Sequence, residues 1–210
     1  MFAYILVILV AYLLGSISFS VIISKKMAGF DVREKGSGNA GATNVLRSVG
    51  KKAAVLTLLC DCLKGVVAVL FAVVVGKIAS NSDKALLVQL AGIAVVVGHT
   101  FPIFFGFKGG KGVATSLGVL LVTNWQIGLI CLVFALVLMA LTKMVSMGSV
   151  GAAILFPVLV LFIKTNFIVT EGSGYLIYSI ILAVLVAFNH RSNIKRILNG
   201  TENKLNFKKA

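Results

Sequence analysis

The stretch AAVLTLLCDCLKGVVAVLFAVVVG, residues 53–76, has 24 positions of which only Asp61 and Lys64 are charged. A helix that crosses the hydrocarbon core of a bilayer needs about 20 consecutive apolar residues. The whole chain shows the same bias, because 59% of its 210 residues are hydrophobic, 12% are charged and the mean hydropathy is +1.06. A soluble domain is about 25% charged. The sequence therefore predicts an integral membrane protein.

Six further apolar segments flank this one, at about residues 2–24, 85–98, 112–123, 126–142, 145–163 and 175–188. They predict an all-α integral membrane protein with about seven transmembrane or partly spanning helices, five to seven being the range, in a single polytopic membrane domain over residues 1–210. Three segments (85–98, 112–123 and 175–188) are short, so we expect them to be tilted, partly re-entrant or continued by flanking residues. The turn near Asn124 is the least defined boundary. The N-terminal segment lacks a leading positive charge and a small-residue cleavage site, which favours a retained anchor.

The distribution of Lys and Arg predicts the orientation. Seven spans place 16 of the 20 basic residues on one side, in loops 25–52 and 99–111, at Lys143 and in the tail from 189. The other side receives Lys77, Lys84 and Lys164. The positive-inside rule then puts the N-terminus outside, the C-terminus in the cytoplasm and the glycine-rich loops on the cytoplasmic face. The net charge of +14 fits contact with anionic lipid headgroups. The sequence predicts no nucleic-acid partner, because the basic residues lie between spans and form no polar module.

A glycine-rich loop, GSGNAGATNVLR, precedes this span at residues 36–47. Glycine lets the backbone curl around a ligand, and exposed backbone N–H groups suit phosphate oxygens. Arginine binds phosphate through two parallel hydrogen bonds. The alternative is an ordinary loop rich in turn residues. The candidate phosphate-binding residues here are Ser37, Gly38, Asn39, Gly41, Thr43, Asn44 and Arg47.

A second glycine-rich stretch, FKGGKG, occupies residues 107–112 and contributes Lys108, Gly109, Gly110 and Lys111 as candidates. It is not the nucleotide-binding P-loop, because that motif needs a glycine where Phe105 stands and Ser or Thr after its lysine, where Gly112 stands. The sequence therefore predicts two phosphate-binding loops on one face of the membrane and no ATPase activity.

A third polar cluster, NHRSNIKR, follows the last span at residues 189–196. His190 and Asn193 lie one helical turn apart, so they face the same way. A single histidine is often structural, and both roles stay open here. Asp61 and Lys64 predict an ion pair inside the span, favoured over catalysis, and Ser146 is a weaker candidate for the polar site. The sequence contains no metal-ligand cluster and no cofactor motif, and it lacks paired catalytic carboxylates, so positioning and charge stabilisation must carry any chemistry.

Together these motifs, in this order, resemble the bacterial membrane acyl-phosphate:glycerol-3-phosphate acyltransferases of the PlsY type. The resemblance extends over essentially the whole chain and includes Asp61-x-x-Lys64-Gly65. It implies transfer of a fatty acyl group from acyl phosphate to the 1-hydroxyl of glycerol 3-phosphate, which gives lysophosphatidic acid and phosphate in phospholipid synthesis. It also implies a multi-pass protein of the bacterial inner membrane whose active site faces the cytoplasm. Membrane lipid is a further partner, and other lipid-synthesis enzymes are candidate partners.

The same resemblance implies roles for single residues. The catalytic and acceptor-site residues would be Ser37, Arg47, Lys111, His190 and Asn193. The glycine-rich backbone around Gly38 to Thr43, together with Ser146, would hold the acyl phosphate. The proton acceptor stays open between His190 and a substrate phosphate.

Two other classes of protein fit parts of the sequence. A transporter for an anionic metabolite would place its site near the membrane midplane in paired repeats, whereas these motifs cluster at one face and no repeat is present. A lipid-binding scaffold would explain the basic tail but not two glycine-rich loops. Turnover of acyl phosphate with glycerol 3-phosphate in detergent, without a sealed compartment, separates the enzyme from both.

Overall fold

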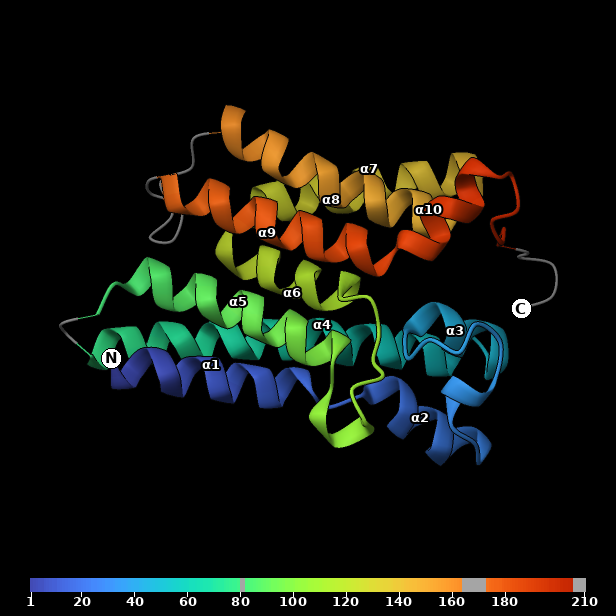
Figure 1. Ribbon diagram of the computed structural model, residues 1–210, viewed down its shortest axis with the longest axis horizontal. Coiled ribbons are helices and arrows are strands. Elements are labelled where there is room, and N and C mark those ends of the chain that lie inside the picture. Colours follow the sequence, from blue (N-terminus) through green and yellow to red (C-terminus); the bar gives the residue numbers. More distant parts are fainter. Residues whose placement is uncertain (80–81, 164–172, 206–210) are drawn as a thin grey trace. The chain divides into compact units, whose positions relative to one another are not determined.

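The structure is a computed structural model that describes residues 1–79, 82–163 and 173–205. Over these ranges it contains α-helices and two short 3₁₀-helices and no strand (Figure 1). The chain divides into two compact units, residues 1–119 and the residues from 120 onward. Each unit is described by itself below.

The first unit consists of four longer helices and several short elements. They are α1 (Phe2–Gly15), α2 (Phe19–Ala28), η1 (Val32–Glu34), α3 (Ala42–Ser48), α4 (Lys51–Ile78), α5 (Lys84–Thr100), η2 (Ile103–Phe105) and the first part of α6 (Val113–Thr123). α1 packs along α5, α4 packs against both, and α2 and α3 pack against α4. α4 has 28 residues, so it is about 42 Å long and exceeds the hydrocarbon thickness of about 30 Å.

The first predicted segment, residues 2–24, is helical but not one continuous helix. α1 ends at Gly15 and α2 begins at Phe19. The last carbonyl groups of a helix have no hydrogen-bond donor within the helix. Here the Lys64 ammonium is a donor at the end of α1: it donates to the carbonyl oxygens of Gly15 at 2.9 Å and of Ile17, just beyond the helix, at 2.8 Å. A long-range hydrogen-bond donor therefore stabilises the break, which the local sequence does not indicate.

Glycines allow the helices of this unit to approach closely. A Cβ on Gly15 would clash with the Val95 carbonyl, and one on Gly98 would clash with the Tyr12 carbonyl. The same relation holds for Gly118, where a Cβ would fall on the Cys62 carbonyl oxygen of α4. Small residues at such contacts are typical of membrane helices. Close helix packing therefore explains why glycine stands at these positions.

The second unit contains the rest of α6, α7 (Trp125–Thr142), α8 (Val145–Phe162), α9 (Ser173–Asn189) and α10 (Arg191–Leu198). α8 packs against α7 and α9. The predicted turn near Asn124 is confirmed: Asn124 separates α6 from α7, and its side-chain oxygen accepts the Ile127 amide N–H at 3.1 Å as an N-cap.

All seven predicted apolar segments are helical. Five helical segments in the described residues are long and apolar enough to cross a membrane, with α1 and α2 counted together as one segment. A sixth is counted if α9 and α10, bent by 64° at their junction, form one span. α6 is apolar but shorter. Lys164, which the orientation argument uses, lies outside the described residues.

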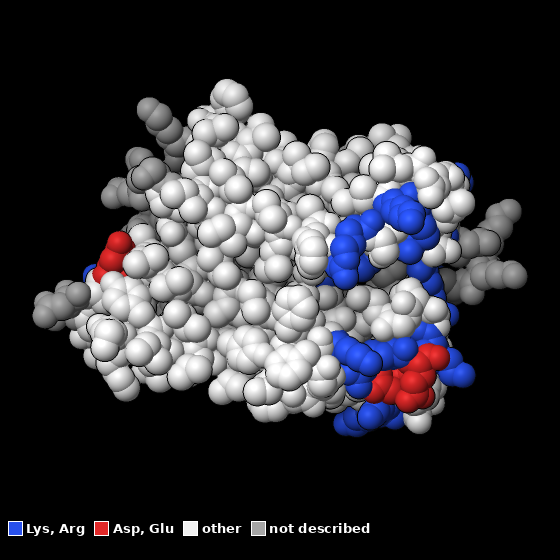
Figure 2. All heavy atoms as spheres, viewed as in Figure 1, with Lys and Arg blue, Asp and Glu red and all other residues white. Residues whose placement is uncertain are grey.

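On the face that Figure 2 shows, charged side chains lie near the ends of the long helices and not along their middle parts. In the first unit Lys and Arg gather around α2 and the loops beside α3, and in the second unit they gather over α10 (Figure 2). The helix faces carry exposed Leu, Val, Ile and Phe instead. Exposed apolar faces with exposed charge near the helix ends are the arrangement that a bilayer requires.

Candidate active site

The first glycine-rich loop is organised by a buried amide. The Asn44 side-chain oxygen accepts the Ser37 amide N–H at 2.9 Å, and its Nδ2 donates to the carbonyl oxygens of Val32, Lys35 and Asn39 at 2.8–3.1 Å. Asn44 is 2% exposed. A buried amide satisfied in this way rigidifies its surroundings. Asn44 therefore fixes the shape of the loop, and its polar atoms point inward.

The second glycine-rich loop folds back on the end of α5. The Gly109 N–H donates to the Thr100 carbonyl and the Gly110 N–H to the His99 carbonyl, both at 3.1 Å. A Cβ on Gly109 would clash with these carbonyls, and one on Gly110 would clash with the His99 ring nitrogen Nε2. Glycine is thus required at 109 and 110 by close packing, since neither has a positive φ.

The two glycine-rich loops lie against each other. The Gly109 carbonyl oxygen accepts the Ala40 amide N–H at 3.3 Å and the Asn39 Nδ2 at 3.4 Å. These bonds join residues 69 and 70 positions apart in the chain. The prediction that residues 36–47 and 108–112 come together is confirmed within the first unit, whereas the side of the membrane on which they lie stays a prediction.

One part of the sequence interpretation is wrong. The backbone N–H groups of Ser37, Gly38, Gly109 and Gly110 were expected to be open to phosphate, but each donates within the protein: Ser37 to Asn44 and Gly38 to the Lys35 carbonyl, with the two later glycines bonded to α5. Side chains must therefore supply more of any phosphate grip than the glycine pattern indicates.

Cationic and hydroxyl side chains surround this junction. Arg47, in the last turn of α3, is exposed and forms no ion pair with a described residue. Lys108 and Ser37 are exposed, and Lys111 and Thr43 are half-buried. The site is therefore strongly basic and accessible from outside the unit, as a site for phosphorylated substrates requires.

Two residues that the sequence interpretation did not assign to the site connect the loops further. Arg33 Nη1 donates to the carbonyl oxygens of Phe105 at 2.6 Å and Lys108 at 3.3 Å. Its Nε and Nη2 donate to the two carboxylate oxygens of Asp31 at 3.0 and 2.8 Å. These hydrogen bonds hold the pKa of the Asp31 carboxyl below its ordinary value.

A buried polar cluster lies beneath the loops. The predicted ion pair is confirmed, with Lys64 Nζ 2.9 Å from Asp61 Oδ1, and both residues are under 5% exposed. His99 Nδ1 lies 3.4 Å from the same oxygen. The sequence placed His99 next to an aromatic stretch and gave no reason to connect it with Asp61. The cluster joins the break after α1 to the turn that carries Gly110.

In the second unit the predicted residues meet at a carboxylate that the sequence interpretation missed. Glu202 Oε1 accepts the Asn193 Nδ2 at 2.8 Å and the Ser146 hydroxyl at 3.0 Å, and Oε2 accepts Arg196 Nε at 2.8 Å. The only sequence signal is a lone acid in a basic tail. Burial alone would raise the pKa of Glu202, but the hydrogen bonds from Asn193, Ser146 and Arg196 outweigh it and lower that pKa.

His190 lies at the N-cap of α10 and is 3% exposed. Its Nδ1 is 2.8 Å from the Val186 carbonyl oxygen. A carbonyl only accepts, so Nδ1 carries a proton in this arrangement. His190 and Asn193 thus have the one-turn relation that the sequence predicts, and Ser146 joins Asn193 through Glu202.

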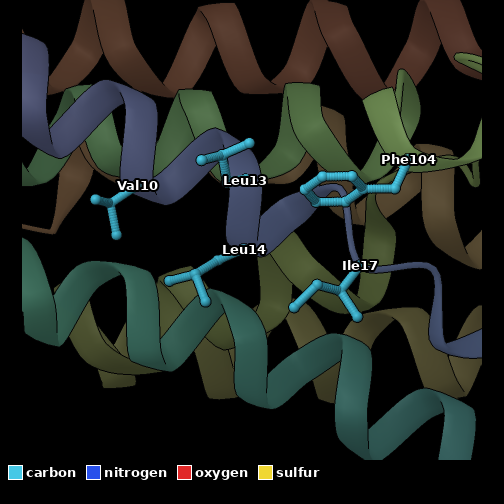
Figure 3. A pocket seen from close by; sticks show the side chains of 5 residues that line it. All are labelled: Val10, Leu13, Leu14, Ile17 and Phe104. Carbon is cyan, nitrogen blue, oxygen red and sulfur yellow. The ribbon is translucent and has the colours of Figure 1, made fainter.

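An apolar groove lies on the flank of α1 in the first unit. Val10, Leu13, Leu14 and Ile17 line it together with Phe104 of η2 (Figure 3). None of these side chains carries a hydrogen-bonding group, so the groove does not bind phosphate. It is an apolar surface beside the basic loops.

The fold and the site define a class of protein: an all-α membrane protein with two basic, glycine-rich loops joined by hydrogen bonds. The sequence profile of the family described as Glycerol-3-phosphate acyltransferase matches residues 5–200, and the chain belongs to that family. It is 48% identical over 208 residues to a glycerol-3-phosphate acyltransferase of Clostridioides difficile (strain 630), covering 99% of this chain and 98% of the relative. A relative of the same name from Neisseria meningitidis (serogroup C, strain FAM18) is 46% identical over 200 residues, with 95% and 96% covered.

Solved structures show the same fold. The crystal structure of PlsY (YgiH), an integral membrane glycerol 3-phosphate acyltransferase in its glycerol 3-phosphate form, matches with a TM-score of 0.85 at 37% identity. The match covers 97% of this chain and 96% of that chain. The lysophosphatidic acid form matches with a TM-score of 0.82 at 36% identity, with 97% and 95% covered. The chain is therefore an integral membrane protein of the PlsY type.

Proposed function

We propose that this protein transfers a fatty acyl group from acyl phosphate to the 1-hydroxyl of glycerol 3-phosphate. The family supplies the acceptor and the place in phospholipid synthesis. The observation that carries the finer assignment is the contact between two basic glycine-rich loops, each next to a cation. Both proposed substrates carry a phosphate, so paired anion-binding loops match the reaction.

The reaction forms one ester bond and breaks one mixed-anhydride bond. The acceptor oxygen attacks the acyl carbon, the bond from that carbon to the phosphate oxygen breaks, and inorganic phosphate leaves. The hydroxyl proton goes either to His190 or to a substrate phosphate. No cofactor or metal is part of the proposal.

We assign Arg47 and Lys111 to the acceptor phosphate and Ser37 to the charge that develops on the donor. His190 and Asn193 orient the acceptor hydroxyls. The residues around Gly38 to Thr43, with Lys108 and Ser146, hold the acyl phosphate. Three earlier candidates take a different role: Asn44 shapes the first loop from within, and the glycines at 109 and 110 permit close packing of the second loop.

The orientation argument supports a cytoplasmic site in the bacterial inner membrane, because the loops that hold these residues carry most of the basic side chains. Membrane lipid surrounds the helices, and other lipid-synthesis enzymes are candidate partners that would deliver acyl phosphate or consume the product.

The deciding experiment uses purified protein in detergent with synthetic acyl phosphate. Phosphate and lysophosphatidic acid should appear together, at equal rates, only when glycerol 3-phosphate is present. Acyl-CoA and acyl carrier protein thioesters serve as alternative donors. Activity with a thioester but not with acyl phosphate contradicts the donor assignment and leaves the family membership intact.

Single variants test the roles. His190→Ala that loses less than about tenfold in turnover, equivalent to about 1.4 kcal/mol, argues against an essential base. Arg47→Lys keeps the charge but loses the planar fork, so we expect a weaker affinity for glycerol 3-phosphate. An unchanged Michaelis constant for the acceptor would contradict bidentate binding by Arg47.

A further inference from the structure

The Asp31–Arg33 pair has no part in the roles assigned above, yet the Arg33 guanidinium donates four hydrogen bonds. Arg33 belongs to η1 and its guanidinium reaches residues 72 and 75 positions away in the chain. The first acceptor, the Phe105 carbonyl oxygen, lies at the end of η2 just before the second loop, and the second, the Lys108 carbonyl oxygen, belongs to that loop. Arg33 therefore links the segment before the first loop directly to the backbone of the second.

The direction of the guanidinium is fixed on its own side. The two Asp31 oxygens accept from Nε and Nη2, and Oδ1 also accepts the Arg33 amide N–H at 3.0 Å. Asp31 is 7% exposed, and Lys25 lies 3.7 Å from its second oxygen. Because the guanidinium is planar, holding Nε and Nη2 on Asp31 also fixes the direction in which Nη1 points. A flexible lysine ammonium does not reproduce this.

The bonds from Arg33 lie beside those that join the loops. The Lys108 carbonyl is one residue before the Gly109 carbonyl, which accepts from Ala40 and Asn39. On the other side, Gly38 N–H bonds to the Lys35 carbonyl, two residues after Arg33. The loop–loop hydrogen bonds at 3.3 and 3.4 Å are long, whereas the Arg33–Phe105 bond at 2.6 Å is short and charge-assisted. Arg33 makes the strongest of these connections.

We propose that Arg33, oriented by Asp31, is a positioning residue that sets the spacing of the two glycine-rich loops and so the separation of the two substrate phosphates. The effect on the separation of the substrate phosphates rests on the proposed function, whereas the effect on the spacing of the loops does not. Acyl transfer between two bound molecules depends on their mutual geometry, and a displacement of about 1 Å costs about 100-fold in rate. Loosening the loops therefore lowers turnover more than the binding of either substrate.

The test replaces Arg33→Lys and measures hydrogen exchange and kinetics on the same purified protein. We expect the peptides that cover 36–41 and 102–112 to exchange at least tenfold faster, while a peptide from the middle of α4 is unchanged. The kcat falls at least tenfold per folded molecule, and the KM for each substrate stays within about threefold. Lys26→Ala removes an exposed cation nearby and should match wild type in every measurement.

Asp31→Asn is the second, milder variant and keeps the proposal testable if Arg33→Lys folds poorly. It leaves Arg33 in place but weakens its orientation, so a smaller change in the same two peptides and in kcat is expected. Loop exchange and kcat within twofold of wild type in both variants overturn the proposal. Faster exchange throughout the first unit, α4 included, assigns Arg33 a general structural role and overturns it equally.

The outcome is separable from the fate of the proposed function. If wild type uses a thioester donor and not acyl phosphate, the donor assignment fails, but loop exchange still decides the spacing, and kcat is then measured with the thioester. If wild type uses acyl phosphate and Arg33→Lys leaves the loops unchanged, the proposed function stands and the positioning role fails.

Discussion

Replacement of Lys64 by Met tests whether the buried ion pair holds the first unit together. The ammonium group is 2.9 Å from Asp61 Oδ1 and donates to the carbonyl oxygens of Gly15 and Ile17 at the break between α1 and α2. Lys64 is 4% exposed. Methionine keeps an unbranched chain of similar shape, so the change removes the charge and the hydrogen bonds with little loss of volume.

The expected cost follows from the burial of both partners. Removing one member of a buried ion pair costs about 3–5 kcal/mol, because the remaining charge is buried without compensation. After Lys64→Met, Asp61 retains only His99, whose Nδ1 is 3.4 Å away. In a chain of this size each kcal/mol corresponds to about 2–4 °C in the unfolding midpoint. We therefore expect the midpoint to fall by roughly 6–20 °C.

A thiol-reactive fluorophore gives the measurement. Cys131 is buried and Cys60 and Cys62 are partly buried, and all three are free thiols that become reactive as the protein unfolds in detergent. The matched control is the double variant Lys64→Met with Asp61→Leu, which removes both charges. Exchange of a whole buried pair for apolar residues is often neutral or favourable, so the double variant should recover at least half of the lost midpoint.

Two results would refute the reasoning. A single variant that melts within about 2 °C of wild type would show that leaving Asp61 without Lys64 costs no more than about 1 kcal/mol, well below the expected 3–5 kcal/mol. A double variant that is less stable than Lys64→Met would show that Asp61 contributes through contacts other than Lys64.

Three further predictions concern other parts of the structure. Gly118→Ala places a Cβ on the Cys62 carbonyl of α4, so overpacking should destabilise the protein by about 1–3 kcal/mol in the same fluorophore assay; an unchanged midpoint would mean that α6 moves away at no cost. Glu202→Gln removes the charge that accepts three hydrogen bonds, and should cost about 1.5–3 kcal/mol, while Glu34→Gln at an exposed position should cost nothing measurable. Because the pKa of Asp31 is lowered in the folded protein, its carboxylate stabilises the fold fully above the ordinary carboxyl pKa. This stabilisation is lost as the pH falls through the lower folded-state pKa. The difference in midpoint between wild type and Asp31→Asn should therefore be constant from pH 7 to about pH 5 and shrink only below about pH 4, and a loss between pH 7 and 5 would contradict the Asp31–Arg33 hydrogen bonds.

Local spacing made several features predictable. The three-residue separation of Asp61 and Lys64 puts them on one face of any helix, so their ion pair could be predicted without knowledge of the packing. The same holds for His190 and Asn193, and for the turn at Asn124, whose side chain caps the next helix. The apolar runs predicted the helices, because only helices satisfy backbone polar groups within a single segment in lipid.

Partners distant in the chain were not predictable. Asn44 was interpreted as a ligand-facing amide, but its polar atoms are used inside the loop. Nothing in the sequence indicated that Arg33 donates a hydrogen bond to the Phe105 carbonyl oxygen, 72 residues away. Glu202 was not singled out, although it joins Ser146, 56 residues earlier, to Asn193.

The sequence by itself therefore determined the class of fold, the helical segments and the chemistry of the loops, because hydropathy, helical repeat and glycine content act over a few neighbouring residues. Only the tertiary structure decided which loop amides are already bonded, that Arg33 links the two glycine-rich loops, and that α1 breaks where Lys64 reaches its last carbonyls. The physical reason is that these helices are apolar on nearly every side. A helix without a distinct apolar stripe does not specify which of its faces meets a neighbour, and the long-range hydrogen bonds depend on that choice.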